Sequence, residues 1–344
     1  MSYYDGTKLL SLKDINGQEP VFFLCTTNRT GGKTTYINKV AINKFKSKKI
    51  RKFLLLYRYD YELKDCSEKF FKDIKPLFFP NDDMTDKAKA KGIYHELYLN
   101  DVPCGYAVAI NKAEQVKKLS HFFTDVDFII LDEFQSETNS YCPNEIQKFI
   151  SILTSVSRGN GKQYRYVPVV MLGNTVSLIN PYYVELGITN RLKHNTNFLK
   201  GDGWVLEQGF VQSASDSFNE SGIARAFNRN KYITYASQNV YLNDNKAFIE
   251  NIKGNSKYVC TLKYENNHYA IREFSELGIL YVDDKADITY HRKITVTTND
   301  HDINYLMLQR NDLFINNLRN LFEKGCFRFK NLKCKEVLLK TISY

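Results

Sequence analysis

Up to residue 175, short apolar segments alternate with polar stretches of helical character. Four apolar runs have the length and continuity of strands that are buried on both faces. They are residues 53–57, 106–110, 128–131 and 167–172. Residues 111–123 and 143–156 lie between such runs and carry apolar positions at helical spacing. This alternation predicts an α/β domain with a mostly parallel sheet and helices on both faces.

The pattern changes twice towards the C-terminus. Residues 198–256 carry glycines, serines and acids with weaker apolar periodicity, which indicates a linker or a small linking subdomain. From residue 257 apolar and polar residues alternate on both sides of Glu265-Asn266-Asn267, a hairpin signal, and residues 317–342 add a helix with strand-like pieces. We therefore predict three parts: an α/β domain at 1–197, a linker at 198–256 and a small α+β domain at 257–344.

Whole-chain composition narrows the class of protein. A length of 344 residues suggests about two domains, and a formal charge of +10 favours a polyanionic partner. The seven cysteines include no C-x-x-C pair, so free thiols in a reducing cytoplasm fit better than a disulfide framework or a zinc site. The N-terminus lacks signal-peptide character and no apolar run reaches membrane-spanning length. We expect a soluble intracellular protein with no membrane partner.

Residues 25–35, CTTNRTGGKTT, follow the apolar run PVFFL and match most of the phosphate-binding pattern G-x-x-x-x-G-K-[ST]. The two glycines let the backbone approach an anion, the lysine suits the β- and γ-phosphates, and the next threonine offers a hydroxyl to Mg²⁺. A threonine stands where the first glycine is expected, and an ordinary glycine turn is the alternative. The predicted nucleotide-binding residues are Thr27, Asn28, Arg29, Thr30, Gly31, Gly32, Lys33, Thr34 and Thr35.

The run at 128–131 ends in Asp132 and Glu133. Ligands of open α/β sheets bind at the carboxyl ends of the strands, so this acid pair is expected beside the glycine loop. Asp132 would then hold Mg²⁺ together with Thr34, and Glu133 would polarise the water that attacks the γ-phosphate. A solvated acidic strand end is the alternative.

Three further polar residues occupy positions that suit the same chemistry. Asn174 ends the next strand and can touch the γ-phosphate or the water, although Gly-Asn pairs also form turns. Arg158, in the loop SRGNGK before that strand, can reach the nucleotide of a neighbouring subunit, although surface arginines are common. Arg58, at the end of the run at 53–57, is a second candidate for sensing phosphate.

In this order the motifs CTTNRTGGKTT, FIILDEF, SRGNGK and VVMLGNT resemble the DNA-packaging (encapsidation) ATPases of phi29-like tailed phages. Members of that family are related to large terminases and to the FtsK/HerA translocases, within the ASCE class of P-loop NTPases. The resemblance implies a motor that uses ATP and Mg²⁺ to move double-stranded DNA into a viral procapsid. Another P-loop phosphotransferase, or a nucleic-acid-binding protein without motor activity, is the alternative.

The resemblance also implies partners and a location. Members form a homo-oligomeric ring, typically a pentamer, at the portal (connector) of an empty procapsid, and in some members a structural packaging RNA joins the ring to the portal. Such a protein works in the cytoplasm of the infected host cell and is only transiently at the portal vertex, outside the mature virion. The C-terminal domain is expected to be RNase H-like, the domain that is a nuclease in terminases.

Two basic stretches are candidates for nucleic-acid contact. Lys87, Lys89 and Lys91 alternate along a predicted loop at 81–92, so they would face one side and could hold DNA phosphates. The stretch 317–342 interleaves basic and aromatic residues, which suits a phosphate backbone with occasional base stacking. A solvated charge run is the alternative for the three lysines, and a solvated basic surface over an aromatic core is the alternative for the C-terminal stretch. The strand before Glu265 lacks a carboxylate, so we expect a vestigial domain that does not cut DNA.

Overall fold

The computed structural model divides the chain into two compact units, Met1–Leu186 with Arg191–Asn243, and Gly187–Asn190 with Asp244–Tyr344. Within these units no helix of the described residues is long and apolar enough to cross a bilayer. The structure describes residues 4–138, 140–159, 161, 163–177, 180–189, 191–192, 196–228, 231–237, 248–297, 300–308 and 312–343.

A nine-stranded sheet forms the centre of the described part of the first unit, in the order β3-β4-β5-β2-β6-β7-β1-β9-β8. The strands from β5 to β9 in this order pair in parallel, while β3, β4 and β8 join antiparallel at the two edges. This confirms the predicted mostly parallel sheet. The strands are β1 (Phe22–Thr27), β2 (Lys52–Tyr57), β3 (Met84–Lys89), β4 (Tyr94–Leu99), β5 (Val102–Ala109), β6 (Val126–Leu131), β7 (Val169–Asn174), β8 (Phe198–Gly201) and β9 (Trp204–Gln208).

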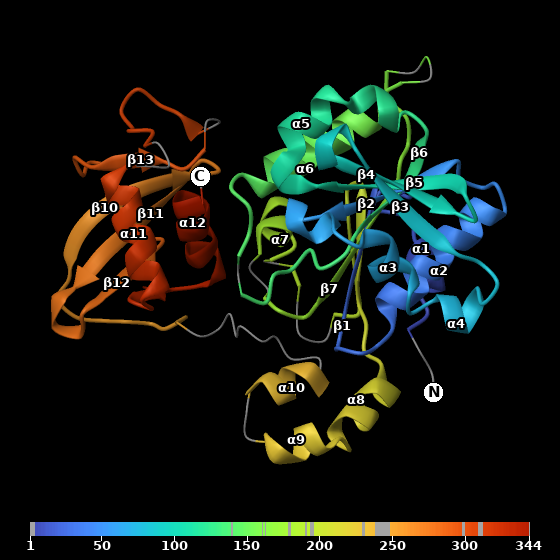
Figure 1. The fold of residues 1–344 in the computed structure, drawn as a ribbon. Coiled ribbons are helices and arrows are strands. Elements are labelled where there is room, and N and C mark those ends of the chain that lie inside the picture. The colour runs from blue at the N-terminus through green and yellow to red at the C-terminus, as the bar shows by residue number, and fades with distance from the viewer. Residues whose placement is uncertain are drawn as a thin grey trace. The chain divides into compact units, whose positions relative to one another are not determined.

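Helices cover both faces of this sheet (Figure 1). Because successive residues of a strand point to opposite faces, neighbouring residues of one strand contact helices on different sides. Phe23 of β1 belongs to the same buried cluster as Ile37 of α2, while the ring of its neighbour Phe22 lies 6.0 Å from that of Phe149 in α6. The first face carries α1 (Thr7–Ser11), α2 (Lys33–Lys46), α3 (Cys66–Phe71) and α4 (Lys75–Phe78). The second carries α5 (Ala113–Lys118), α6 (Glu145–Val156) and α7 (Pro181–Glu185).

The sheet extends beyond the boundary predicted at residue 197. β9 pairs in parallel with β1 and buries Trp204, so residues 198–208 belong to the first unit and not to a linker. The glycines read as loop signals are the turn of the β8–β9 hairpin, where Gly203 has a φ of 72°. Three short helices follow within the predicted linker: α8 (Gln212–Asn219), α9 (Gly222–Ala226) and α10 (Lys231–Ser237).

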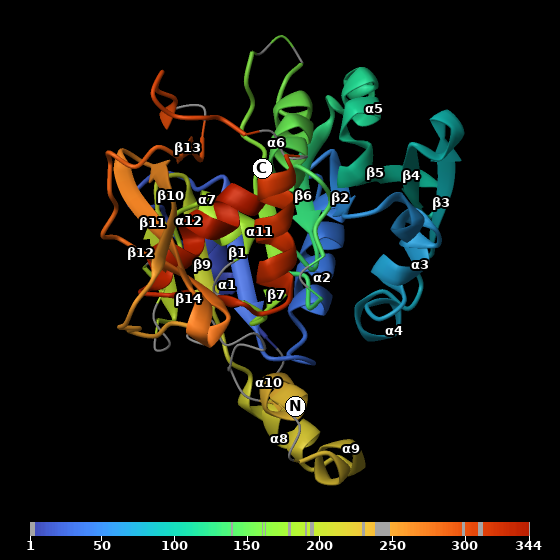
Figure 2. The same ribbon diagram turned by 90° about the vertical axis from the view of Figure 1, so that its left-hand side faces the viewer.

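The second unit is a small α+β domain, as predicted. Its sheet has the order β13-β10-β11-β12-β14 among the described residues, and its buried cluster includes Leu318 and Val337 from two helices. The helices α11 and α12 are labelled beside these strands in Figure 2. Glu265 and Asn266 both have positive φ at the β10–β11 turn, as two-residue hairpins prefer. The elements are β10 (Lys257–Tyr264), β11 (Asn267–Phe274), β12 (Ile279–Asp283), β13 (Lys293–Thr295), α11 (Leu313–Glu323), β14 (Phe327–Phe329) and α12 (Leu332–Ser343).

The interleaved aromatics of the C-terminal stretch lie inside this domain. Phe327 and Phe329 are buried in the cluster between sheet and helices, and Phe322 packs against it. Lys330 is paired with Asp284. The predicted stacking of bases on these rings was therefore wrong, because the rings alternate with basic residues to fill a core.

Candidate nucleotide site

The glycine loop runs from the end of β1 into α2, as the motif predicts. Gly32 precedes the helix with a φ of 85°, a conformation that favours glycine. A Cβ atom on Gly31 would lie 3.0 Å from Val211 Cγ2 and 3.2 Å from Thr27 Oγ1, so no larger residue fits without a shift. Thr27 is buried and its hydroxyl donates to the Asn28 carbonyl over 2.9 Å. Threonine therefore fits the position of the expected first glycine, because its polar atom is satisfied within the loop.

The outer side of the loop is joined to the segment that leads into α8. Asn28 Nδ2 donates to the Val211 carbonyl over 3.1 Å, and Val211 N–H donates to Asn28 Oδ1 over 2.9 Å. Tyr4 N–H donates to the Gly31 carbonyl over 2.8 Å. The loop conformation is thus tied to residues that are remote in sequence, which the local motif did not reveal.

The Lys33 ammonium donates to Asn174 Oδ1 over 2.6 Å. The contact exists because β7 lies between β1 and β6, so the carboxyl end of β7 meets the loop directly. Lys33 is only 8% exposed, and this burial lowers its pKa although Asp132 opposes the shift. The structure therefore brings together the predicted phosphate lysine and the predicted γ-phosphate sensor.

Thr34 and Asp132 also converge at this edge. Thr34 Oγ1 lies 3.4 Å from Asp132 Oδ1, and Thr35 follows in the first turn of α2. Burial raises the pKa of Asp132, while the Lys33 charge lowers it. A hydroxyl and a carboxylate are oxygen ligands of the kind that Mg²⁺ takes beside nucleotide phosphates. The donor set fits the predicted metal.

Glu133 begins the turn after β6 in a left-handed conformation, with a φ of 56°. This conformation is uncommon for a residue with a long side chain, and such outliers cluster at functional sites. The turn is held by Glu133 N–H, which donates to Asp132 Oδ1 over 2.9 Å. Glu133 is exposed to solvent on one side. Partial desolvation by the surrounding protein, followed by the neighbouring Asp132 charge, raises the pKa of its carboxyl.

Arg58 occupies a place different from the predicted phosphate contact. Its side chain is 10% exposed, and Nε lies 3.0 Å from Glu145 Oε2 at the start of α6. Nη2 donates to the carbonyls of Glu133 and Phe134, each over 3.0 Å. Its guanidinium thus contacts the backbone of the turn at Glu133. The position of Arg58 at the end of a strand could not by itself indicate this contact.

Arg29 leaves the glycine loop and pairs with Glu137, which lies beyond the acid pair. Nε donates to Glu137 Oε1 over 3.0 Å, and the guanidinium carbon lies 5.4 Å from the centroid of the Tyr232 ring. Tyr235 Oη donates to Glu137 Oε1 over 2.8 Å, so α10 shares the carboxylate. Although burial opposes it, the Glu137 charge raises the pKa of Arg29. Sequence reasoning missed Glu137 and both tyrosines.

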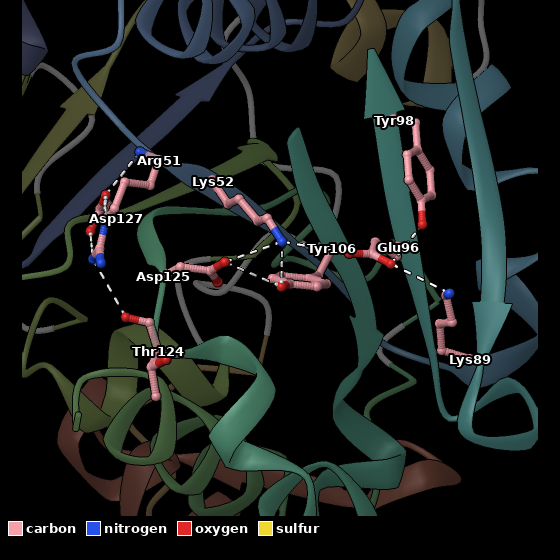
Figure 3. Close-up of polar contacts among 9 residues, drawn as sticks. All are labelled: Arg51, Lys52, Lys89, Glu96, Tyr98, Tyr106, Thr124, Asp125 and Asp127. Carbon is pink, nitrogen blue, oxygen red and sulfur yellow. Dashed lines mark hydrogen bonds and ion pairs between the residues drawn. The ribbon is translucent and has the colours of Figure 1, made fainter. Parts of the chain in front are cut away.

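Arg158 is exposed. It lies near the amino ends of the parallel strands, whereas the glycine loop lies at their carboxyl ends. Helix α6 begins at Glu145 beside the acid pair and runs about 18 Å, at 1.5 Å per residue, to Val156. There Arg165 donates to the Val156 carbonyl over 2.9 Å and to Asp127 Oδ1 over 3.1 Å. Figure 3 shows Arg51 directed to the same Asp127 at the amino end of β6. Arg158 therefore lies far from its own subunit's loop.

Lys87 and Lys89 belong to the edge strand β3, and not to the predicted loop. They share one face of the strand, whereas Lys91 follows in a 3₁₀ turn with a φ of 58°. Lys89 Nζ lies 3.6 Å from Glu96 Oε2, which also accepts from Tyr98 (Figure 3). Lys87 and Lys91 are exposed. The strand was missed because the segment MTDKAK has few apolar residues.

A family model described as "Podovirus DNA encapsidation protein (Gp16)" matches residues 1–343. The chain belongs to this family. It is therefore a phage DNA-packaging ATPase, which confirms the predicted family, fold and ATPase activity.

Individual relatives agree with the family match. The DNA packaging protein of Bacillus phage phi29 is 24% identical over 304 residues, which cover 87% of this chain and 86% of that protein. A solved structure described as "The Phi-28 gp11 DNA packaging Motor" matches with a TM-score of 0.68 and 14% identity, over 99% of this chain and 98% of that chain. "The bacteriophage Phi-29 viral genome packaging motor assembly" matches with a TM-score of 0.61 and 22% identity, over 98% and 99%. These two likenesses support the fold.

Proposed function

We propose that this chain is one subunit of a ring that hydrolyses ATP to drive double-stranded DNA into a viral procapsid. One observation carries the proposal: the ends of β1, β6 and β7 meet at one edge of the sheet, where Lys33 contacts Asn174 and Thr34 faces Asp132. This edge combines an anion-binding loop, a metal ligand pair and an exposed carboxylate, which are the parts that ATP hydrolysis requires.

Each residue then has a defined part in hydrolysis. The ATP phosphates would lie on the backbone N–H groups of the loop and at the N-terminus of α2, with Lys33 on the β- and γ-phosphates. Thr34 and Asp132 would hold Mg²⁺, which neutralises charge on the phosphate oxygens. Glu133 would orient the attacking water and accept its proton. Asn174, already bound to Lys33, would register loss of the γ-phosphate.

Arg58 is a positioning residue in this scheme. Its Nη2 holds the carbonyl of Glu133 over 3.0 Å, and its Nε is fixed by Glu145. Because Glu133 adopts a left-handed backbone, an external contact that fixes this turn also fixes the direction of the carboxylate.

Arg158 would act on the nucleotide of the neighbouring subunit. It is exposed and lies at the amino edge of its own sheet, so it has no route to its own site across the length of α6. A ring in which the amino edge of one subunit faces the carboxyl edge of the next would supply this arginine in trans. Arginines supplied in this way stabilise the charge on the transferred phosphoryl group.

The partners of this ring follow from the family and from charge. We propose double-stranded DNA as the translocated polymer, and the portal and procapsid as the docking partners. The phi29 and Phi-28 structures that this chain resembles are packaging motors. We further propose a pentamer joined to the portal by a packaging RNA, acting in the cytoplasm of the infected host. A net charge of +10 suits both nucleic acids.

We propose that the C-terminal domain binds its partners without cutting DNA. Asp283 is paired with Arg272 over 2.9 Å, and Asp300 accepts from the N–H groups of Glu265 and Asn266, each over 3.0 Å. Two-metal cleavage needs several carboxylates directed at the same ions. These carboxylates are instead engaged separately in holding strands and a turn, so we propose that the RNase H-like fold is retained for docking.

The test compares ATP hydrolysis with and without double-stranded DNA and procapsids. Wild-type protein should be stimulated. Glu133→Gln should bind ATP normally but stop turnover, because an amide cannot accept the proton, and Lys33→Ala should weaken ATP binding. Glu62→Gln removes a carboxylate close enough to influence Glu133 and serves as the matched control, which should keep turnover. Turnover in Glu133→Gln equal to that of Glu62→Gln would show that the catalytic assignment is wrong.

A further inference from the structure

A second group of metal-ligand side chains lies where α3 packs against the β3–β4 hairpin. The Cys66 thiol, an Asp86 carboxylate oxygen and a His95 ring nitrogen lie within 4.8 Å of one another. They come from three separate elements: α3, β3 and β4. No other such group of three is found in the part of the chain that the structure describes.

The fold directs these side chains to one point. In the antiparallel pair β3–β4, Ala88 lies opposite His95 and Asp86 opposite Leu97, so Asp86 and His95 are diagonal neighbours on one face. Asp86 Oδ2 lies 2.6 Å from His95 Nδ1. Cys66 is fully buried at the first position of α3 and faces the same pair.

The carboxylate is held in place by a neighbour of the cysteine. Ser67 N–H donates to Asp86 Oδ1 over 3.2 Å, and its hydroxyl donates to the same oxygen. Asp86 therefore keeps its second oxygen on the side of the histidine. Outer hydrogen bonds of this kind fix the direction of metal-binding carboxylates.

We propose that Cys66, Asp86 and His95 bind a divalent transition metal ion of the zinc class, with water as the fourth ligand. Sulfur, imidazole and carboxylate together suit Zn²⁺ or Co²⁺ and exclude Mg²⁺, which takes oxygen ligands. Bonds of roughly 2.0 to 2.3 Å in a tetrahedron put ligand atoms about 3.4 Å apart. The Asp86–His95 pair, now 2.6 Å apart, would open by about 1 Å on binding, within the reach of side-chain rotation.

The bound ion would tie α3 to the edge hairpin. β3 is the last strand of the sheet, and its other face carries Lys87 and Lys89. A metal on the inner face would fix this strand from behind without covering its lysines. None of the three ligands belongs to the nucleotide loop or to the acid pair that follows β6.

The test is a Co²⁺ titration of the purified, metal-stripped full-length protein in the presence of excess Mg²⁺. We expect one equivalent to bind with visible ligand-field bands of tetrahedral intensity and a thiolate-to-cobalt charge-transfer band, both lost when Zn²⁺ is added. His95→Gln and Cys66→Ser should each weaken binding at least tenfold, and Ser67→Ala about tenfold. Cys104→Ser, which removes another buried thiol, should bind as wild type.

Several outcomes would overturn the proposal. One is wild-type protein that shows no charge-transfer band. Another is a band that persists in both Cys66→Ser and His95→Gln, or is lost equally in Cys104→Ser. Displacement of Co²⁺ by Mg²⁺ would place the ion at the nucleotide loop instead. Fluorescence of Trp204, the single tryptophan of the chain, reports whether each variant is folded.

Discussion

Replacing Glu145 with alanine should strongly destabilise the first unit and slow hydrolysis without weakening ATP binding. The Glu145 side chain is 2% exposed and pairs with the buried Arg58 guanidinium. It also accepts from Tyr182 Oη and from Cys142 N–H, each over 2.8 Å. Removing one partner of a buried ion pair costs about 3 to 5 kcal/mol, because the other charge stays buried without compensation. The Tyr182 hydroxyl adds to this cost, but not additively.

Trp204 is the single tryptophan and lies buried in β9, so its fluorescence follows unfolding of the first unit alone. A loss of about 4 kcal/mol should lower the midpoint by roughly 8 to 16 °C, at about 2 to 4 °C per kcal/mol for a unit of this size. Glu68→Ala breaks an exposed pair with Lys72 and should cost no more than about 0.5 kcal/mol. Equal midpoints for Glu145→Ala and Glu68→Ala would refute the buried-pair reasoning.

Further predictions concern the ring, the edge strand and the C-terminal domain. Subunits with Arg158→Ala or Glu133→Gln should each be inactive, yet mixed rings should regain ATPase activity, and verified mixed rings without rescue would rule out action in trans. Neutralising the three lysines of the β3 region should reduce the slope of the logarithm of the DNA-binding constant against the logarithm of the salt concentration by about 2.7. An unchanged slope would exclude DNA contact there. These lysines are Lys87, Lys89 and Lys91. Asp300→Ala should destabilise the second unit by about 1 to 3 kcal/mol, because two turn N–H groups lose their acceptor. Wild-type protein should show no nuclease activity with Mg²⁺ or Mn²⁺, and metal-dependent cleavage abolished by Asp300→Ala would overturn the docking role.

The local sequence pattern was sufficient to predict the strands at the centre of the sheet and the residues at the carboxyl ends of those strands. Continuous apolar runs predicted β2, β5, β6 and β7, because strands buried on both faces need no polar positions. The glycine loop and the acid pair were predicted from short motifs whose residue types follow from phosphate and metal chemistry. Their contact through Asn174 follows once β7 is inserted between β1 and β6.

Edge strands and long-range contacts were not predictable in the same way. β3 is exposed and polar, and the β8–β9 hairpin is marked by glycines, so both resembled loops. Arg58 was assigned to phosphate because nothing near it in sequence indicates Glu145, which lies 87 residues away. Glu137 is 108 residues from Arg29. Such pairs depend on which strands become neighbours, and this is a property of the whole sheet.

The pair of Arg29 and Glu137 provides a test of whether Arg29 reaches the nucleotide. If Arg29 moves to the phosphates when ATP binds, it must leave Glu137. The free energy needed to break the Arg29–Glu137 pair then lowers the affinity for ATP. Both side chains are about one-third exposed, at 36% and 28%, so the pair is worth about 1 kcal/mol. Glu137→Gln should then tighten ATP binding about fivefold, measured by titration of a fluorescent ATP analogue. Glu62→Gln, the same charge change without an Arg29 contact, corrects for long-range electrostatics. An equal affinity in the two variants would mean that Arg29 stays on Glu137, and that the predicted contact between Arg29 and the nucleotide does not form.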